Sequence, residues 1–155
     1  MNILKYIILL LFSSLLFAQE TLSLLEISSS SPQSLDSIKK PLFNSFDNAL
    51  KIAKEEHKII LVELVSTNCL FCDKMEKEVL SKERVNEAIN KDFVFAKVNI
   101  DVDEIPLGLS PQMTPMFVFA TADKNVEDIR LGFMEEEIFL TLLTEERKKI
   151  NSLWK

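Results

Sequence analysis

The sequence is poor in the residues on which many catalytic and binding motifs depend. Its 155 residues include two glycines, one histidine and two cysteines. Two glycines cannot build a glycine-rich phosphate loop or a dinucleotide-binding fingerprint. The single histidine, His57, excludes histidine-based zinc hydrolases and leaves little basis for a Ser-His-Asp triad. Any chemistry that the chain performs must therefore depend on its two cysteines.

An excess of positive charge is also missing. Lysines and arginines number 18 against 24 aspartates and glutamates, which gives a net charge of −6. Because nucleic-acid binding needs a basic surface, we expect no nucleic-acid partner. Hydrophobic residues make up 47% and charged residues 27%, values that are typical of a globular chain. The length suits one domain of ordinary size.

The first 18 residues have the pattern of a secretory signal peptide. Lys5 precedes an apolar run from Tyr6 to Phe17, interrupted only by two serines, and Ala18 is a suitable last residue before cleavage. The run is short for a membrane span, although an uncleaved anchor is the alternative. We therefore predict a signal peptide at residues 1–18 and secretion into an oxidising compartment, in which a disulfide can persist.

Residues 19–42 show no sustained hydrophobic periodicity and contain four consecutive serines followed by Pro32. This composition predicts a flexible linker or N-terminal arm. The folded domain is therefore placed at residues 43–155.

Regular hydrophobic patterns follow in that domain. Helical patterns near 46–56, after the second cysteine and around 85–89 alternate with strands, so the first strands should be parallel. The last two strands flank a tight turn at 123–125 and should be antiparallel. The sequence thus predicts an α/β fold with a mixed central β-sheet flanked by helices on both faces. The predicted strands are 59–65, 93–100, 116–121 and 126–131, with a short helix or loop at 101–108 and a final helix at 135–153.

The two cysteines form the motif Cys69-Leu70-Phe71-Cys72, at the junction of an apolar strand and a helix. A cysteine at a helix N-terminus can be stabilised as a thiolate by free N–H groups and the helix dipole. Cys72, one turn further on, is near enough to close a disulfide with Cys69. Zinc coordination would need two more ligands, and a purely structural disulfide across so small a loop would gain little entropy. The pattern favours redox chemistry.

At this point the sequence resembles the thioredoxin superfamily. The strand–CxxC–helix unit and the later Thr114-Pro115 carry this resemblance. Within the superfamily, the stretches CLFCDKMEKEV and FVFAKVNID are similar to those of bacterial secreted thioredoxin-like proteins of the thiol:disulfide interchange type. The resemblance extends over residues 43–153 and implies a thioredoxin-like fold.

The resemblance also implies roles for two charged residues. Glu63 matches a carboxylate buried beneath the active site, and Lys97 matches the lysine that pairs with it. A carboxylate buried in an apolar strand should have a raised pKa and could accept the proton of Cys72 during thiol–disulfide exchange. A surface position is the alternative for each of these two side chains.

Four further residues are implied to contact substrate. Pro115 matches the family's cis-proline, which would leave the backbone of Thr114 open to pair with a substrate strand. Leu70 and Phe71 stand where many thioredoxins have Gly-Pro, and they should form an apolar docking patch. Asn68 replaces the usual tryptophan. With these differences the sequence does not fix a reduction potential.

The function predicted from the resemblance is that of a periplasmic thiol–disulfide oxidoreductase, preferentially a reductase. Its substrates would be oxidised secreted proteins or apocytochrome c, and a membrane thiol reductant would supply electrons. We expect a monomer that needs no cofactor and no metal. Two alternatives lack redox turnover: a Cu(I)-binding module using the cysteines with Met75 or Met113, and a chaperone-like interaction domain.

Overall fold

The fold is described by a computed structural model that covers residues 44–153. The predicted signal peptide at 1–18 and linker at 19–42 lie outside the described residues. The helices and strands follow the predicted order, and most predicted ends agree within one residue. The elements are α2 (Phe46–Glu56), β1 (Ile59–Val65), α3 (Leu70–Met75), η2 (Glu76–Leu80), α4 (Glu83–Asp92), β2 (Phe93–Asn99), η3 (Pro106–Gly108), β3 (Met116–Ala120), β4 (Val126–Leu131) and α5 (Glu136–Leu153).

The described strands form one mixed sheet in the order β2-β1-β3-β4. β1 runs parallel to β2 and antiparallel to β3, and β4 pairs antiparallel with β3. Every residue of β1 is buried, as its continuous apolar sequence predicts for a central strand covered on both faces. The register places Glu63 of β1 opposite Lys97 of β2. The predicted mixed sheet is therefore confirmed.

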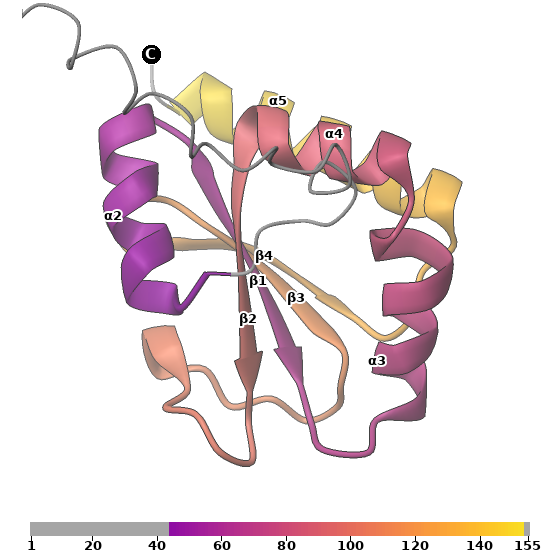
Figure 1. Cartoon of the computed structure of the whole chain (residues 1–155). Helices are drawn as coiled ribbons and strands as arrows, with labels where there is room; N and C mark the ends of the chain where they lie inside the picture. Colours follow the sequence, from indigo (N-terminus) through magenta and orange to yellow (C-terminus); the bar gives the residue numbers. More distant parts are fainter. Residues whose placement is uncertain (1–43, 154–155) are drawn as a thin grey trace, which may run out of the picture. The chain divides into compact units, whose positions relative to one another are not determined.

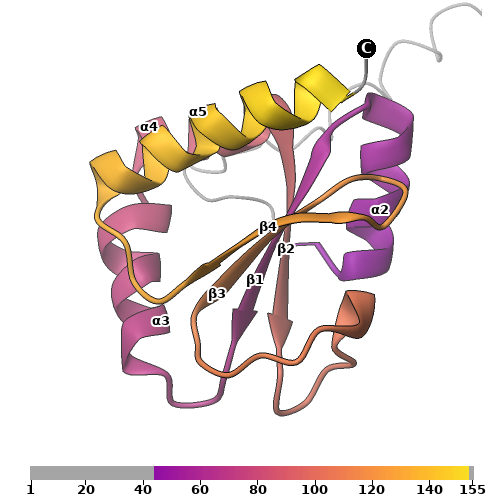
Figure 2. The same cartoon turned by 180° about the vertical axis from the view of Figure 1, so that it is seen from behind.

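Helices cover both faces of this sheet, as Figure 1 and the reverse view in Figure 2 show. Side chains alternate along a strand, so Ile60, Val62 and Leu64 pack on the face that carries α2. Ile59 and Leu61 point to the opposite face, where they join a core with residues of α3, η2, α4 and α5. Glu63 lies in phase with Ile59 and Leu61, which directs its side chain toward the face of the cysteine-bearing helix.

Local capping explains the ends of α2. The Ser45 side chain accepts a hydrogen bond from the backbone N–H of Asn48, as an N-cap residue does. His57 ends the helix in the left-handed conformation, with φ of 54°, and its N–H bonds to the carbonyl of Ala53. The only histidine of the sequence is thus an exposed C-cap.

The helix after the cysteines differs from the regular α-helix that the sequence pattern predicts. α3 ends at Met75, and the chain continues as the π-helical turn η2. A π-helical turn has more residues per turn than an α-helix, and both Val79 and Leu80 are buried here. Such turns frequently occur near functional sites. Helical periodicity alone does not reveal it.

A charged cluster joins α5 to the edge strand β4. Glu146 of α5 is 4% exposed, and its neighbours are Asp128 and Arg130 of β4 and Lys149 of α5. Burial, followed by the hydrogen bond with Asp128, raises the pKa of Glu146 to about 7. Burial opposes the charge of Asp128, but its hydrogen bonds and the nearby cations hold the pKa of Asp128 below its usual value.

We expect Glu146→Gln to stabilise the protein at pH 8 and to have little effect at pH 5. The folded state holds a proton on Glu146 that the unfolded chain releases near pH 4.5. Stability associated with this group is therefore lost as pH rises from 4.5 through 7. A glutamine stays neutral, so the melting temperature should rise by a few degrees at pH 8 only, since about 1 kcal/mol corresponds to several degrees in a small domain.

Thermal unfolding followed by circular dichroism at both pH values would measure this effect. Exposed Glu145, next in sequence, provides the matched control Glu145→Gln. A Glu146→Gln protein that melts below the wild type at pH 8 would contradict the prediction.

Within residues 44–153, no helix combines the length and the hydropathy needed to cross a bilayer.

Candidate functional site

Three loops meet at one end of the sheet. Because β1 and β2 are parallel, the turn after β1 and the loop after β2 leave the sheet at the same end. β3 is antiparallel to β1 and therefore begins there, just after Thr114 and Pro115. Figure 1 shows this end below the arrowheads of β1 and β2. The predicted redox motif lies in the first of these loops.

Cys69 and Cys72 are joined by a disulfide. Cys69 is the N-cap of α3, and the backbone N–H of Cys72 donates to Cys69 Sγ at 3.1 Å. Cys69 is half-buried, whereas Cys72 is 6% exposed. The preceding Asn68 has φ of 59°, a left-handed conformation that asparagine tolerates better than most residues. In the reduced protein, this arrangement would favour a thiolate at Cys69 and an enclosed thiol at Cys72.

A chain of two hydroxyl groups ends on the sulfur of Cys69. Thr114 Oγ1 donates to Cys69 Sγ at 3.3 Å and lies 2.8 Å from Ser66 Oγ. Because the Thr114 proton is directed to sulfur, Ser66 must donate to Thr114. The peptide bond between Thr114 and Pro115 is cis, and Pro115 is buried. Ser66 was not among the predicted site residues, since a serine at a strand end carries no distinctive signal.

Glu63 lies in the middle of β1 and has no exposed surface. Lys97 Nζ is 3.3 Å from Glu63 Oε2 and 3.0 Å from Glu76 Oε2, so one lysine bridges two carboxylates. Apart from Lys97, no residue in the described part of the chain donates a hydrogen bond to the Glu63 carboxylate. The structure therefore places the predicted Glu63–Lys97 pair in contact, and it adds Glu76.

Burial dominates the electrostatics of this group. It raises the pKa of Glu63 to about 7, against the opposing effect of the positive charge on Lys97. Burial also opposes the charge of Lys97, but Glu63 and Glu76 outweigh it and raise the pKa of that lysine. Glu63 can thus gain or lose a proton near neutral pH while Lys97 stays charged.

Glu76 connects this charged group to the cysteines. It follows Cys72 by four residues, and its backbone N–H donates to the carbonyls of Cys72 and Asp73. Glu76 thus follows Cys72 by about one helical turn, and through Lys97 it is linked to Glu63. The sequence contained a usable signal, because a residue four positions after Cys72 shares its helix face.

The loop after β2 is attached to the cysteine turn. The backbone N–H of Thr67 donates to Asp101 Oδ2 at 2.7 Å, and Asn99 Nδ2 donates to Thr67 Oγ1 at 3.4 Å. Asp103 Oδ2 accepts from the backbone N–H of Asn99 at 2.7 Å. The bonds of Asp101 and Asn99 hold the 99–103 loop against Thr67, two residues before Cys69.

The predicted docking patch is exposed. Leu70 is 74% and Phe71 56% exposed, although both are large apolar side chains. Met113, next to Thr114, is 51% exposed. Exposed apolar side chains therefore lie next to the cysteine pair in the sequence and next to Thr114. Exposed apolar surface of this kind is typical of a docking site.

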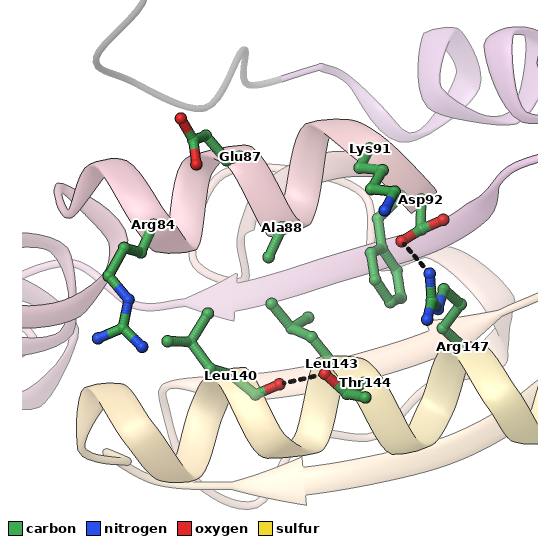
Figure 3. A pocket seen from close by; sticks show the side chains of 10 residues that line it. Arg84, Glu87, Ala88, Lys91, Asp92, Leu140, Leu143, Thr144 and Arg147 are labelled. Atoms are coloured by element: carbon green, nitrogen blue, oxygen red, sulfur yellow. Dashed lines mark hydrogen bonds and ion pairs between the residues drawn. The ribbon is translucent and has the colours of Figure 1, made fainter.

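A separate groove of about 460 Å³ lies between α4 and α5 (Figure 3). Its floor includes Ala88, Leu140 and Leu143, and Arg147 at its edge is 3.3 Å from Asp92. The groove contains neither cysteine. This groove is therefore separate from the candidate site.

The two methionines considered as Cu(I) ligands, Met75 and Met113, differ in their exposure. Met75 is fully buried in the core that Ile59 and Leu61 form with the helices, whereas Met113 is exposed. Among residues 44–153, no group of three or more His, Cys, Asp or Glu side chains is placed to hold a metal ion. No observation favours the Cu(I) alternative over redox exchange.

In the reduced protein, we expect Cys69 to react with iodoacetamide before Cys72 at neutral pH. Cys69 is more exposed, and the N–H group of Cys72 and the hydroxyl of Thr114 both point at its sulfur. Peptide mapping after partial alkylation measures the order. Faster labelling of Cys72 would contradict the assignment of Cys69 as the attacking thiol.

Comparison with protein families agrees with this geometry. The family model described as a thioredoxin-like domain matches residues 46–146. No curated protein sequence matches the chain.

Several solved structures have the same fold. The structure titled DsbH oxidoreductase is 17% identical, with a TM-score of 0.59 over 78% of this chain and 95% of that one. A putative disulphide-isomerase from Bacteroides thetaiotaomicron is 24% identical, with a TM-score of 0.59 over 70% and 93% of the two chains. A thioredoxin from Thermus thermophilus is 25% identical, with a TM-score of 0.55 over 66% and 84%.

Proposed function

We propose a function for this chain, which belongs to the thioredoxin-like domain family. In this proposal it is a periplasmic thiol–disulfide oxidoreductase that reduces disulfides in secreted proteins. A thioredoxin-like domain with the Cys69–Cys72 pair supports thiol–disulfide oxidoreductase activity. The observation that carries the proposal is the position of this pair, with a half-buried Cys69 at the start of α3 and an enclosed Cys72 behind it.

The proposed reaction has two exchange steps. The Cys69 thiolate attacks one sulfur of the substrate disulfide, forms a mixed disulfide and releases the other sulfur as a thiolate, which takes a proton from water. Cys72 then loses its proton and attacks Cys69 Sγ, which releases the second substrate thiol. The substrate gains two electrons and two protons, and the protein is left with the Cys69–Cys72 disulfide.

Glu63 is the proposed proton acceptor for Cys72 in the second step. Its pKa of about 7 lets it take a proton at neutral pH, and Lys97 and Glu76 connect it toward the surface. Thr114 and Pro115 are proposed to pair with the substrate backbone, and Leu70 and Phe71 to contact its side chains.

Regeneration requires an electron donor. A dithiol reductant, proposed to reside in the membrane, would reduce the Cys69–Cys72 disulfide by the same exchange in reverse. The proposed substrates are oxidised secreted proteins or apocytochrome c, and the protein is proposed to act as a monomer without metal or cofactor.

The proposed location depends on residues 1–18. We expect cleavage after Ala18, so that the mature chain starts near Gln19. N-terminal sequencing of protein isolated from its native compartment measures the start. An intact Met1 in the membrane fraction would mean that the segment is retained as an anchor.

Reduction of insulin in the presence of dithiothreitol tests the proposed function. The wild type should accelerate precipitation of the insulin B chain, and the Cys69→Ser/Cys72→Ser double variant should not. Equal, slow precipitation with both proteins would instead support the chaperone-like alternative. The direction of electron flow is tested by trapping thiols in intact cells, where a reductase should be mostly in the dithiol form.

A further inference from the structure

Exposed apolar side chains lie on all three loops at the cysteine end of the sheet. Leu70 follows Cys69 directly, and Met113 precedes the Thr114 that donates to Cys69 Sγ. Val102, in the loop after β2, is 75% exposed although large and apolar. It follows Asp101, which accepts from the backbone of the cysteine turn. An apolar surface spread over three loops is larger than the CxxC motif alone would form.

Acidic side chains accompany this surface. Asp73 follows Cys72 in α3, and Asp101, Asp103 and Glu104 flank Val102; all four are exposed. Asp101 and Asp103 each accept a backbone hydrogen bond of 2.7 Å, so their positions are fixed before any partner arrives.

Asp103 and Glu104 line a groove with Lys97 and Lys124, whereas Asp73 and Asp101 do not. Lys74 lies 4.2 Å above the ring of Phe133 and 3.8 Å from Glu78. Lys97 is held between Glu63 and Glu76. The exposed residues on the loops beside the cysteine turn therefore include apolar side chains and the carboxylates of Asp73 and Asp101.

We infer that this surface selects substrates in which the disulfide lies in a basic segment with an apolar residue beside the cysteine. The inference deepens the proposed function and rests on it. Lysine or arginine side chains on the substrate would face Asp73 and Asp101, and the apolar residue would contact Leu70 and Val102. An acidic segment would be repelled by the same fixed carboxylates.

The test compares three cyclic disulfide peptides that share one ring sequence, with leucine after the first cysteine. They differ only in the two residues that flank the ring, which are lysines, glutamines or glutamates. Reduced protein is mixed with each peptide, and the second-order rate constant of disulfide exchange is measured. At about 0.01 M salt, where screening extends over about 30 Å, the lysine peptide should react about 10-fold or more faster than the glutamate peptide. At about 1 M salt the two rate constants should converge.

The site variant is Asp73→Asn/Asp101→Asn, which keeps side-chain shape and leaves a carbonyl oxygen for the Thr67 N–H. Its matched control is Glu55→Gln/Glu87→Gln, which removes the same charge from exposed positions on α2 and α4. The site variant should lose most of the preference for the lysine peptide, and the control should keep it. Replacing the peptide leucine by serine should slow the wild type several-fold and the Leu70→Ser protein less.

Neutral hydroxyethyl disulfide separates failure of this inference from failure of the proposed function. If the reduced wild type does not react with it, the oxidoreductase function itself is overturned. If the wild type and the variants all react with hydroxyethyl disulfide, each peptide rate constant can be divided by the rate constant for this reagent. The ratio removes any change in the intrinsic reactivity of Cys69. A lysine preference that is absent, or equally lost in both double variants, would overturn the inference.

Discussion

Replacing Cys72 by serine is expected to stop turnover and to trap the protein on its substrates as mixed disulfides. Cys69 can still attack, because its environment at the start of α3 includes the Thr114 hydroxyl and does not depend on a thiol at position 72. The second exchange cannot occur, because no sulfur remains to attack Cys69 Sγ. The mixed disulfide should therefore accumulate until an external thiol releases it.

Non-reducing gels of protein recovered from cells, followed by mass spectrometry of the reduced bands, would detect these adducts. Cys69→Ser is the matched control, and it should form none, because Cys72 is only 6% exposed. Abundant adducts with Cys69→Ser and few with Cys72→Ser would reverse the assigned order of attack. The same experiment identifies the substrates.

The fold could be predicted closely from the sequence because its signals are local. The apolar run 59–65 coincides with the central strand, and the pattern 126–131 coincides with the edge strand β4. Strand direction followed from the connections, since helices join β1 to β2 and a tight turn joins β3 to β4. The π-helical turn η2 was not predicted, because one extra residue in a turn changes the apolar spacing too little to stand out from a regular helix.

Fewer of the site residues than of the strands and helices could be predicted from the sequence, and the residues that were missed were missed for one physical reason. Cys69, Cys72, Glu63 and Lys97 stand out because their residue types are unusual in their setting. Ser66 and Glu76 are common polar residues whose partners Thr114 and Lys97 lie 48 and 21 positions away. Spacing from Cys72 could place Glu76 on the cysteine side of its helix, but its contact with Lys97, like that of Ser66 with Thr114, depends on the tertiary structure. Asp101 likewise lies 34 positions from Thr67, whose backbone N–H donates to the Asp101 carboxylate.

Replacing Glu63 by glutamine is expected to slow the release of substrate about 10-fold or more, which corresponds to about 1.4 kcal/mol in the barrier. Glutamine keeps the shape of the side chain but cannot accept the proton of Cys72. The first attack by Cys69 should change little, because that step does not use Glu63. Lys97 keeps an anionic partner, since Glu76 Oε2 lies 3.0 Å from its Nζ.

The pH dependence makes this effect distinct from a structural one. Glu63 must be deprotonated to accept a proton, and its pKa is about 7, so the second step of the wild type should slow as pH falls from 8 to 6. In Glu63→Gln the inflection near pH 7 that Glu63 causes should disappear. The variant should be no less stable than the wild type, and more stable above pH 7, because the raised pKa means that the folded state disfavours the charged carboxylate.

Stopped-flow measurement of both exchange steps from pH 6 to 8 decides the role of Glu63. Exposed Glu78, which lies in η2 together with Glu76, offers the control Glu78→Gln, which removes a carboxylate that pairs with Lys74 and not with Lys97. A second step in Glu63→Gln with wild-type speed and pH dependence would mean that Glu63 is a bystander. Water or Glu76 would then have to accept the proton of Cys72, and a slower second step in Glu76→Gln would identify Glu76 as the acceptor.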